Sequence, residues 1–125
     1  MATEYTLRRA DGQPFGSFNQ VQARLRELFP AIEFFWTESG PEKIARAAER
    51  GITFPPAILA YLPDLPSLFE GVAEGDDYHV TFGLGHVEPV VCLYVTPRGE
   101  GPELDRGLAA LEADAGAQLR VSGEE

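Results

Sequence analysis

The two histidines of this chain are the residues best suited to proton transfer or metal binding near neutral pH. His79 lies in a segment whose apolar and polar residues alternate, as in a strand, and His86 follows the end of that segment. Seven residues of extended chain would separate the two side chains by roughly 23 Å. They cannot share a metal ion or a proton within one chain, so the sequence predicts no site built on both histidines.

Cys92 is the only cysteine, which excludes an intrachain disulfide and leaves no cysteine pair for zinc. Because its neighbours are apolar, we expect it to be a small buried side chain. Ser17 and Ser39 stand three residues before Gln20 and Glu42, which is the spacing of a helix capping box, and neither serine lies in a Gly-x-Ser-x-Gly motif. We therefore expect no metal, no cofactor and no nucleophilic catalysis.

Glu33 and His79 remain as weak catalytic candidates. Glu33 lies in the apolar segment 31–37. If a helix covered its face, a buried carboxyl group there could act as a general acid or base. An exposed position on an uncovered face is the commoner situation for such a residue, so the sequence leans away from an enzyme without excluding one.

Negative charge is concentrated in the second half of the chain. Residues 1–51 carry seven acids and seven bases, whereas residues 52–125 carry thirteen acids and three arginines, which accounts for the net charge of −10. A surface of one sign attracts partners of the opposite sign, and a negative surface repels nucleic acid and anionic lipid. The charge therefore predicts a basic protein partner, with no nucleic acid and no membrane.

The densest acids flank two predicted strand ends that a hairpin would bring to one side of a sheet. We expect the partner to contact them there: Glu70, Glu74, Asp76, Asp77, Glu100, Glu103 and Asp105. Their spacing does not match a calcium-binding loop. The simpler alternative is a solvated turn, in which Asp76 pairs with Arg98.

Hydrophobic periodicity predicts an α+β fold in a single domain over residues 1–125. Three helices are expected, between Ser17 and Pro30, between Ser39 and Gly51, and from Pro102 to Gly116. Five strands are expected over residues 4–10, 31–37, 78–84, 90–96 and 117–121, with 78–84 and 90–96 forming an antiparallel hairpin. Helices on one face of this mainly antiparallel sheet would form a two-layer sandwich, and a ferredoxin-like arrangement would accommodate the order.

Residues 52–77 form a proline-rich helical insert in this scheme, because four prolines prevent one continuous helix or strand. The insert is expected to close the open side of the core. Alternatively, it could line a small-molecule pocket with Trp36, Phe54, Tyr61 and Phe69, or it could form a homodimer interface. The leading hypothesis remains a non-catalytic, inhibitor-like or immunity-like binding protein in the cytoplasm, and a small-molecule-binding or catalytic domain is the alternative.

Overall fold

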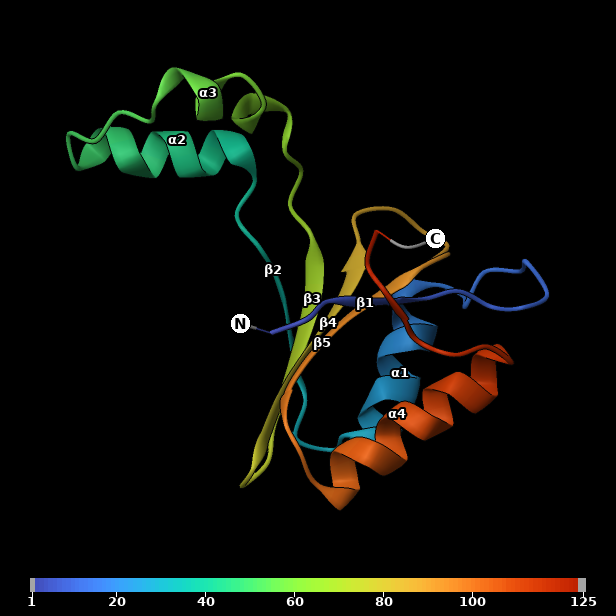
Figure 1. Cartoon of the computed structure of the whole chain (residues 1–125). Helices are drawn as coiled ribbons and strands as arrows, with labels where there is room; N and C mark the ends of the chain where they lie inside the picture. The colour runs from blue at the N-terminus through green and yellow to red at the C-terminus, as the bar shows by residue number, and fades with distance from the viewer. Residues whose placement is uncertain (1, 124–125) are drawn as a thin grey trace.

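The computed structural model describes residues 2–123 and has one antiparallel sheet with helices on one face. The sheet has six strands in the order β2-β3-β4-β5-β1-β6. Helices α1 (Phe18–Leu28) and α4 (Pro102–Ala115) cover one of its faces (Figure 1). The strands are β1 (Tyr5–Leu7), β2 (Glu33–Trp36), β3 (Phe69–Glu74), β4 (Tyr78–Gly85), β5 (Leu93–Gly99) and β6 (Arg120–Val121). The α+β class is confirmed, whereas the ferredoxin-like arrangement is not.

Local signals set the helix ends as predicted. The Ser17 hydroxyl accepts a hydrogen bond from the Gln20 amide at 3.2 Å, and the Gln20 side chain accepts one from the Ser17 amide at 2.9 Å. Ser39 and Glu42 form the same reciprocal pair at the start of α2 (Gly40–Glu49). Gly116, with φ of 65°, ends α4 in the left-handed conformation that glycine adopts most easily.

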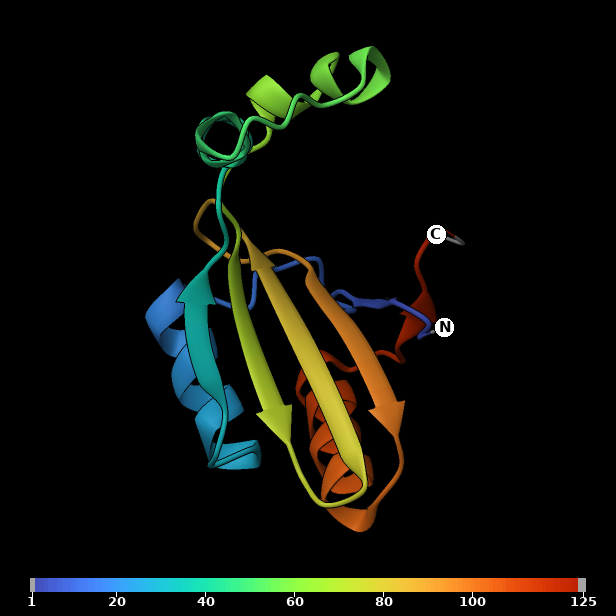
Figure 2. The same ribbon diagram turned by 90° about the vertical axis from the view of Figure 1, so that its left-hand side faces the viewer.

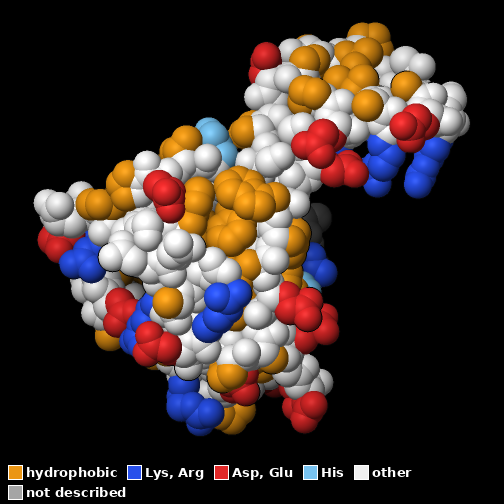
Figure 3. All heavy atoms as spheres, turned by 180° about the vertical axis from the view of Figure 1, so that it is seen from behind, with side chains coloured by type: hydrophobic (Ala, Val, Ile, Leu, Met, Phe, Trp, Pro, Cys, Tyr) orange, Lys and Arg blue, Asp and Glu red, His pale blue; other side chains and the backbone are white. Residues whose placement is uncertain are grey.

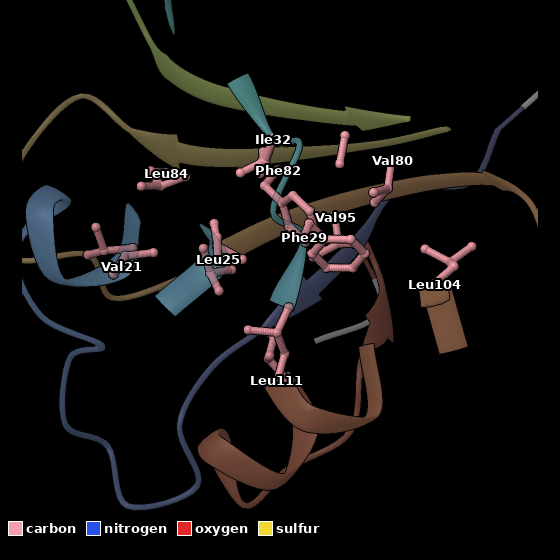
Figure 4. Packing of buried hydrophobic residues seen from close by; sticks show 14 of the residues in the cluster. Val21, Leu25, Phe29, Ile32, Val80, Phe82, Leu84, Val95, Leu104 and Leu111 are labelled. Atoms are coloured by element: carbon pink, nitrogen blue, oxygen red, sulfur yellow. The ribbon is translucent and has the colours of Figure 1, made fainter. Parts of the chain in front are cut away.

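The hydrophobic core lies between the sheet and the two helices (Figure 4). Phe29, at the end of α1, is 0% exposed, and its ring centroid lies 5.3 Å from that of Phe82 on β4. Gly107 on α4 faces the Phe29 ring so closely that a Cβ on this residue would lie 2.3 Å from Cζ of the ring. Cys92 is buried at 6% exposure, as expected.

The opposite face of the sheet carries no helix (Figure 2). One row of residues across it consists of partners that face each other on β2, β3, β4 and β5, namely Phe35, Glu70, Gly83 and Tyr94. The next row holds Glu33, Val72, Thr81 and Thr96, and a third holds Glu74, His79 and Arg98. We call this surface the open face.

The predicted hairpin is confirmed, but its register is shifted by three residues. β5 begins at Leu93, whereas Val90 forms an isolated bridge with Gly16. Arg98 therefore faces His79 across the hairpin. The expected pairing of Asp76 with Arg98 is wrong, because chain geometry around the loop, rather than strand hydrophobicity, determines which residues face each other.

Strand β3 was not predicted and belongs to the segment assigned to the insert. Its buried positions are Phe69, Gly71 and Ala73, so only the first is a large apolar residue. Gly71 is required by close packing, since a Cβ there would lie 2.7 Å from the Phe34 ring. Small residues on the core side weaken the hydrophobic alternation by which a strand is recognised.

Residues 38–68 form an arm that projects from the ends of β2 and β3 toward the open-face side of the sheet (Figures 1 and 2). It contains α2, α3 (Pro56–Leu59) and a short 3-10 helix, Leu62–Asp64. No arm residue belongs to the buried core cluster of the body, by which we mean the rest of the molecule that the structure describes. The expectation that the insert closes the core is therefore wrong: the arm packs on itself, with Leu62 4% exposed beneath the start of α2.

Candidate functional site

Six of the seven predicted partner-binding acids gather at one end of the sheet, on the segment from the end of β3 through the turn to β4 and on the segment from the end of β5 through the first turn of α4. This end is the one farthest from the arm (Figure 1). We call it the acidic end and define it by Glu74, Asp76, Asp77, Glu100, Glu103 and Asp105. These acids were expected to converge because an antiparallel hairpin brings the start of one strand beside the end of the other. The structure has this hairpin, although its register is shifted.

Backbone contacts hold the two segments of the acidic end together. The Glu100 amide donates a hydrogen bond to the Asp77 carbonyl oxygen at 3.1 Å. Gly99 has φ of 78°, and a Cβ there would lie 2.1 Å from the same oxygen, so only glycine allows this approach. The resulting shallow open hollow is lined by Asp77, Gly99, Glu100, Gly101, Pro102 and Asp105.

A buried tyrosine anchors the acidic end to the core. The Tyr78 hydroxyl donates a hydrogen bond to the Glu103 carboxylate, and the Tyr78 residue is only 8% exposed. Burial, the hydrogen bond and the negative charge of Glu103 together raise the pKa of Tyr78 to about 12. The sequence suggested an apolar strand position for Tyr78 but not this link to the first turn of α4.

This contact predicts a loss of stability at high pH. A raised pKa in the folded state favours the neutral phenol, so its stabilising effect is complete below the ordinary pKa of 10.0 and is lost as the pH rises toward about 12. The difference in free energy of unfolding between the wild type and Tyr78→Phe should therefore be constant below pH 10.0 and change between these two values. Urea unfolding across this range measures it, and a parallel pH dependence of the two proteins would contradict the assignment.

The carboxylates of the acidic end are largely unneutralised. Within residues 2–123, no ion pair within 4.0 Å joins Asp76, Asp77, Glu100 or Asp105 to an arginine or lysine. Arg98 and Arg106 lie on the bordering elements, so the six acids retain a surplus of negative charge. A purely structural role exists for two of them, since Glu103 and Asp105 lie in the first turn of α4, where negative charge stabilises a helix.

Glu70 is the predicted acid that lies elsewhere. It stands near the start of β3 on the open face, between Phe35 of β2 and Gly83 of β4. Burial raises the pKa of its carboxyl group, and the positive charge of Lys43 on the arm partly offsets this effect. The sequence grouped it with Glu74 because both lie in one acidic segment. In the structure Glu70 lies near the start of the six-residue strand β3 and Glu74 lies at its end, so the two residues are near opposite ends of the sheet.

The two weak catalytic candidates lie on different strands of the open face, Glu33 on β2 and His79 on β4. Glu33 is exposed on the open face, so the burial on which its acid–base role depended is absent. His79 is half-buried on the same face, with Nε2 3.6 Å from a Glu74 carboxylate oxygen, and β3 lies between its strand and the strand of Glu33. His86 follows the opposite end of β4 from His79, as expected.

The four residues proposed to line a pocket are divided between the body and the arm. Trp36 and Phe69 are in contact in the body, with ring centroids 5.0 Å apart, and Trp36 remains 52% exposed. Phe54 and Tyr61 belong to the arm, where Tyr61 is 53% exposed. The expected pocket between sheet and insert is not formed by these residues, because the insert projects outward instead of covering the sheet.

The acids of the acidic end are spread along a rim and do not converge on one point. Over residues 2–123, no group of three or more His, Cys, Asp or Glu side chains is arranged to hold a metal ion. In the same range, no helix is long and apolar enough to cross a bilayer.

The surplus of negative charge at the acidic end is of the kind that attracts a cationic surface. Comparison of the chain with protein-family models, with curated proteins and with solved structures gave no match.

Proposed function

We propose that this protein is a non-catalytic binding protein whose acidic end engages a basic protein partner, in the manner of an inhibitor or immunity protein. The observation that carries the proposal is the gathering of six acids from two distant segments onto one rim, four of them without an arginine or lysine within ion-pair distance among residues 2–123. Charges on an interface rim act mainly on the association rate and on its salt dependence.

The test begins with affinity capture from lysate at low salt, followed by identification of the retained proteins. A retained cationic protein is then purified, and its association rate is measured at several salt concentrations. The variant in which Asp76, Asp77, Glu100 and Asp105 become amides should associate about tenfold more slowly or worse, with a weaker salt dependence.

A matched control separates local recognition from overall charge. Converting Asp11, Glu49, Asp64 and Glu88 to amides removes the same number of negative charges from exposed positions on the loop after β1, on the arm and on the loop between β4 and β5, all away from the acidic end. This control should keep most of the wild-type association rate. Equal slowing by the two variants, or failure to retain any cationic protein, would exclude the acidic end as the binding site.

The small-molecule alternative is weaker, because it required a pocket between the sheet and the insert. The arm projects from the end of the sheet instead of covering it (Figures 1 and 2). Of the four proposed lining residues, Trp36 and Phe69 belong to the body, and Phe54 and Tyr61 belong to the arm. No specific contact of the described residues favours that alternative over protein binding.

A further inference from the structure

The outer part of the arm, residues 52–68, exposes an unusual concentration of large apolar side chains. Five residues within it are each more than one-third exposed: Ile52 (54%), Leu59 (36%), Tyr61 (53%), Leu65 (38%) and Leu68 (37%). Seen from behind, hydrophobic side chains gather on the upper surface of the arm, away from the body (Figure 3). Grouped apolar exposure of this kind marks interaction surfaces in soluble proteins.

The arm cannot bury this surface against its own body. It contributes no residue to the core cluster of the described chain, and its own buried contact is the packing of α2 against the 3-10 helix around Leu62. A unit of about 30 residues is too small to form a substantial core of its own. Burial of residues 52–68 therefore requires another molecule.

The low charge of the arm favours a second copy of this chain as the occupant. Residues 38–68 carry four acids and three bases, so the arm has a net charge of −1 while the rest of the chain carries −9. Between Arg50 and Glu70 the only charged residue is Asp64. Two copies therefore repel each other least when they meet through residues 52–68, and a cationic partner is drawn instead to the far end of the sheet.

The projection of the arm also suits a symmetric contact. In a twofold dimer both copies use the same patch, so each apolar residue of the patch is buried once on each side of the interface. Because the arm extends away from the body, pairing of two arms would keep the strongly negative bodies apart and leave both acidic ends accessible (Figure 1). We propose that the outer part of the arm, residues 52–68, is a homodimer interface.

The first measurement is the molar mass by sedimentation over a range of protein and salt concentrations. We expect a monomer of 13.7 kDa when the protein is dilute and twice that mass when it is concentrated. Raising the salt should strengthen the dimer, because it screens repulsion between bodies, whereas it should weaken binding of a basic partner. The opposite salt effects make this proposal testable apart from the acidic end, and a monomer at every concentration would overturn it.

Substitutions locate the interface. Ile52→Glu or Tyr61→Glu should raise the dissociation constant of the dimer by roughly 100-fold, because each substitution enters the interface twice. Val87→Glu is the control, since Val87 is 62% exposed on the body between β4 and β5. A dimer that survives both arm substitutions, or that is lost only with Val87→Glu, would place the contact elsewhere.

A thiol-protection experiment avoids dependence on disruptive charges. Because Cys92 is buried, a cysteine introduced at an exposed position reacts in its place. The Tyr61→Cys variant carries such a thiol on the arm, and the separate Val87→Cys variant carries one on the body. The thiol at position 61 should react with a maleimide more slowly as the protein becomes more concentrated, whereas the thiol at position 87 should react at a constant rate. Equal behaviour of the two thiols would overturn the interface.

Discussion

Phe29→Ala is expected to lower the free energy of unfolding by about 3–5 kcal/mol, which is a large share of the stability of a small domain. Phe29 is 0% exposed and lies between the sheet and α4, against Phe82 and Tyr78 and beneath Gly107 (Figure 4). Removing the ring loses the favourable free energy of transferring it from water to the protein interior. It also leaves a cavity between α1, α4 and the sheet, which these rigid elements cannot easily close. Urea unfolding of the variant measures the loss.

Phe35→Ala provides the matched control, because it removes the same atoms from the open face, where Phe35 is 43% exposed. Its expected cost is about 1 kcal/mol, since little apolar surface leaves the protein interior. If the two substitutions cost the same, Phe29 does not have a central position in the core.

The contact between Phe29 and Gly107 can also be tested by a double-mutant cycle. Gly107→Ala in the wild type forces a Cβ toward the Phe29 ring and should cost about 1–3 kcal/mol despite the better helix propensity of alanine. In the Phe29→Ala background the same change fills space and should become stabilising. Additive effects of the two substitutions would show that they do not touch.

Gly40→Ala has the second large expected effect, namely loss of the folded arm with the body left intact. A Cβ on Gly40 would lie 1.5 Å from the Leu62 carbonyl oxygen, and the Gly40 amide donates to the Leu65 carbonyl oxygen at 2.8 Å. The start of α2 can therefore no longer pack on the 3-10 helix. Limited proteolysis should cut within residues 38–68 much faster than in the wild type, while the thermal transition of the body changes little.

Gly51→Ala is the appropriate comparison on the same arm. No atom lies within 4 Å of a Cβ at Gly51, so its only penalty is the left-handed backbone with φ of 70°, worth about 1 kcal/mol. The arm of this variant should remain resistant to protease. A Gly40→Ala protein that is as resistant as Gly51→Ala would contradict the close packing of α2 on Leu62. Since the proposed dimer requires a folded arm, Gly40→Ala should also yield a monomer.

The arrangement of the molecule separates two kinds of surface. The acidic end lies at one end of the sheet and the apolar part of the arm beyond the other (Figure 1). A dimer through the arms would therefore present two acidic ends, and bivalent binding strengthens attachment wherever a partner offers two sites. This consequence depends on both proposals, each of which has its own test.

Several features of the fold could be predicted because they depend on neighbours along the chain. The capping boxes at Ser17 and Ser39, the end of α4 at Gly116 and the hairpin of β4 with β5 all follow from residues a few positions apart. The same holds for the burial of Cys92, whose apolar neighbours indicated it. Local sequence also indicated that acids flank the ends of the hairpin, which is why six of the seven candidate acids lie together in the fold.

Other features depended on contacts between distant residues and could not be predicted from local patterns. Gly71 lies in the segment that was assigned to the insert, yet its missing side chain makes room for the Phe34 ring and allows β3 to join the sheet. Exposure of Tyr61 on an arm could not be distinguished from burial over the core, because apolar composition alone does not say which surface a segment meets. Glu70 was misplaced because β3, which carries it away from Glu74, was not predicted.

The sequence by itself determined the helix ends, the α+β class and the uneven charge, because capping, periodicity and composition act through nearby residues or through simple totals. Only the tertiary structure decided the strand register, the outward direction of the arm and the division between the acidic end and the open face. These depend on which distant surfaces pack together, and that choice is made by shape: Gly107 against Phe29, Gly71 against Phe34, and Gly40 against Leu62.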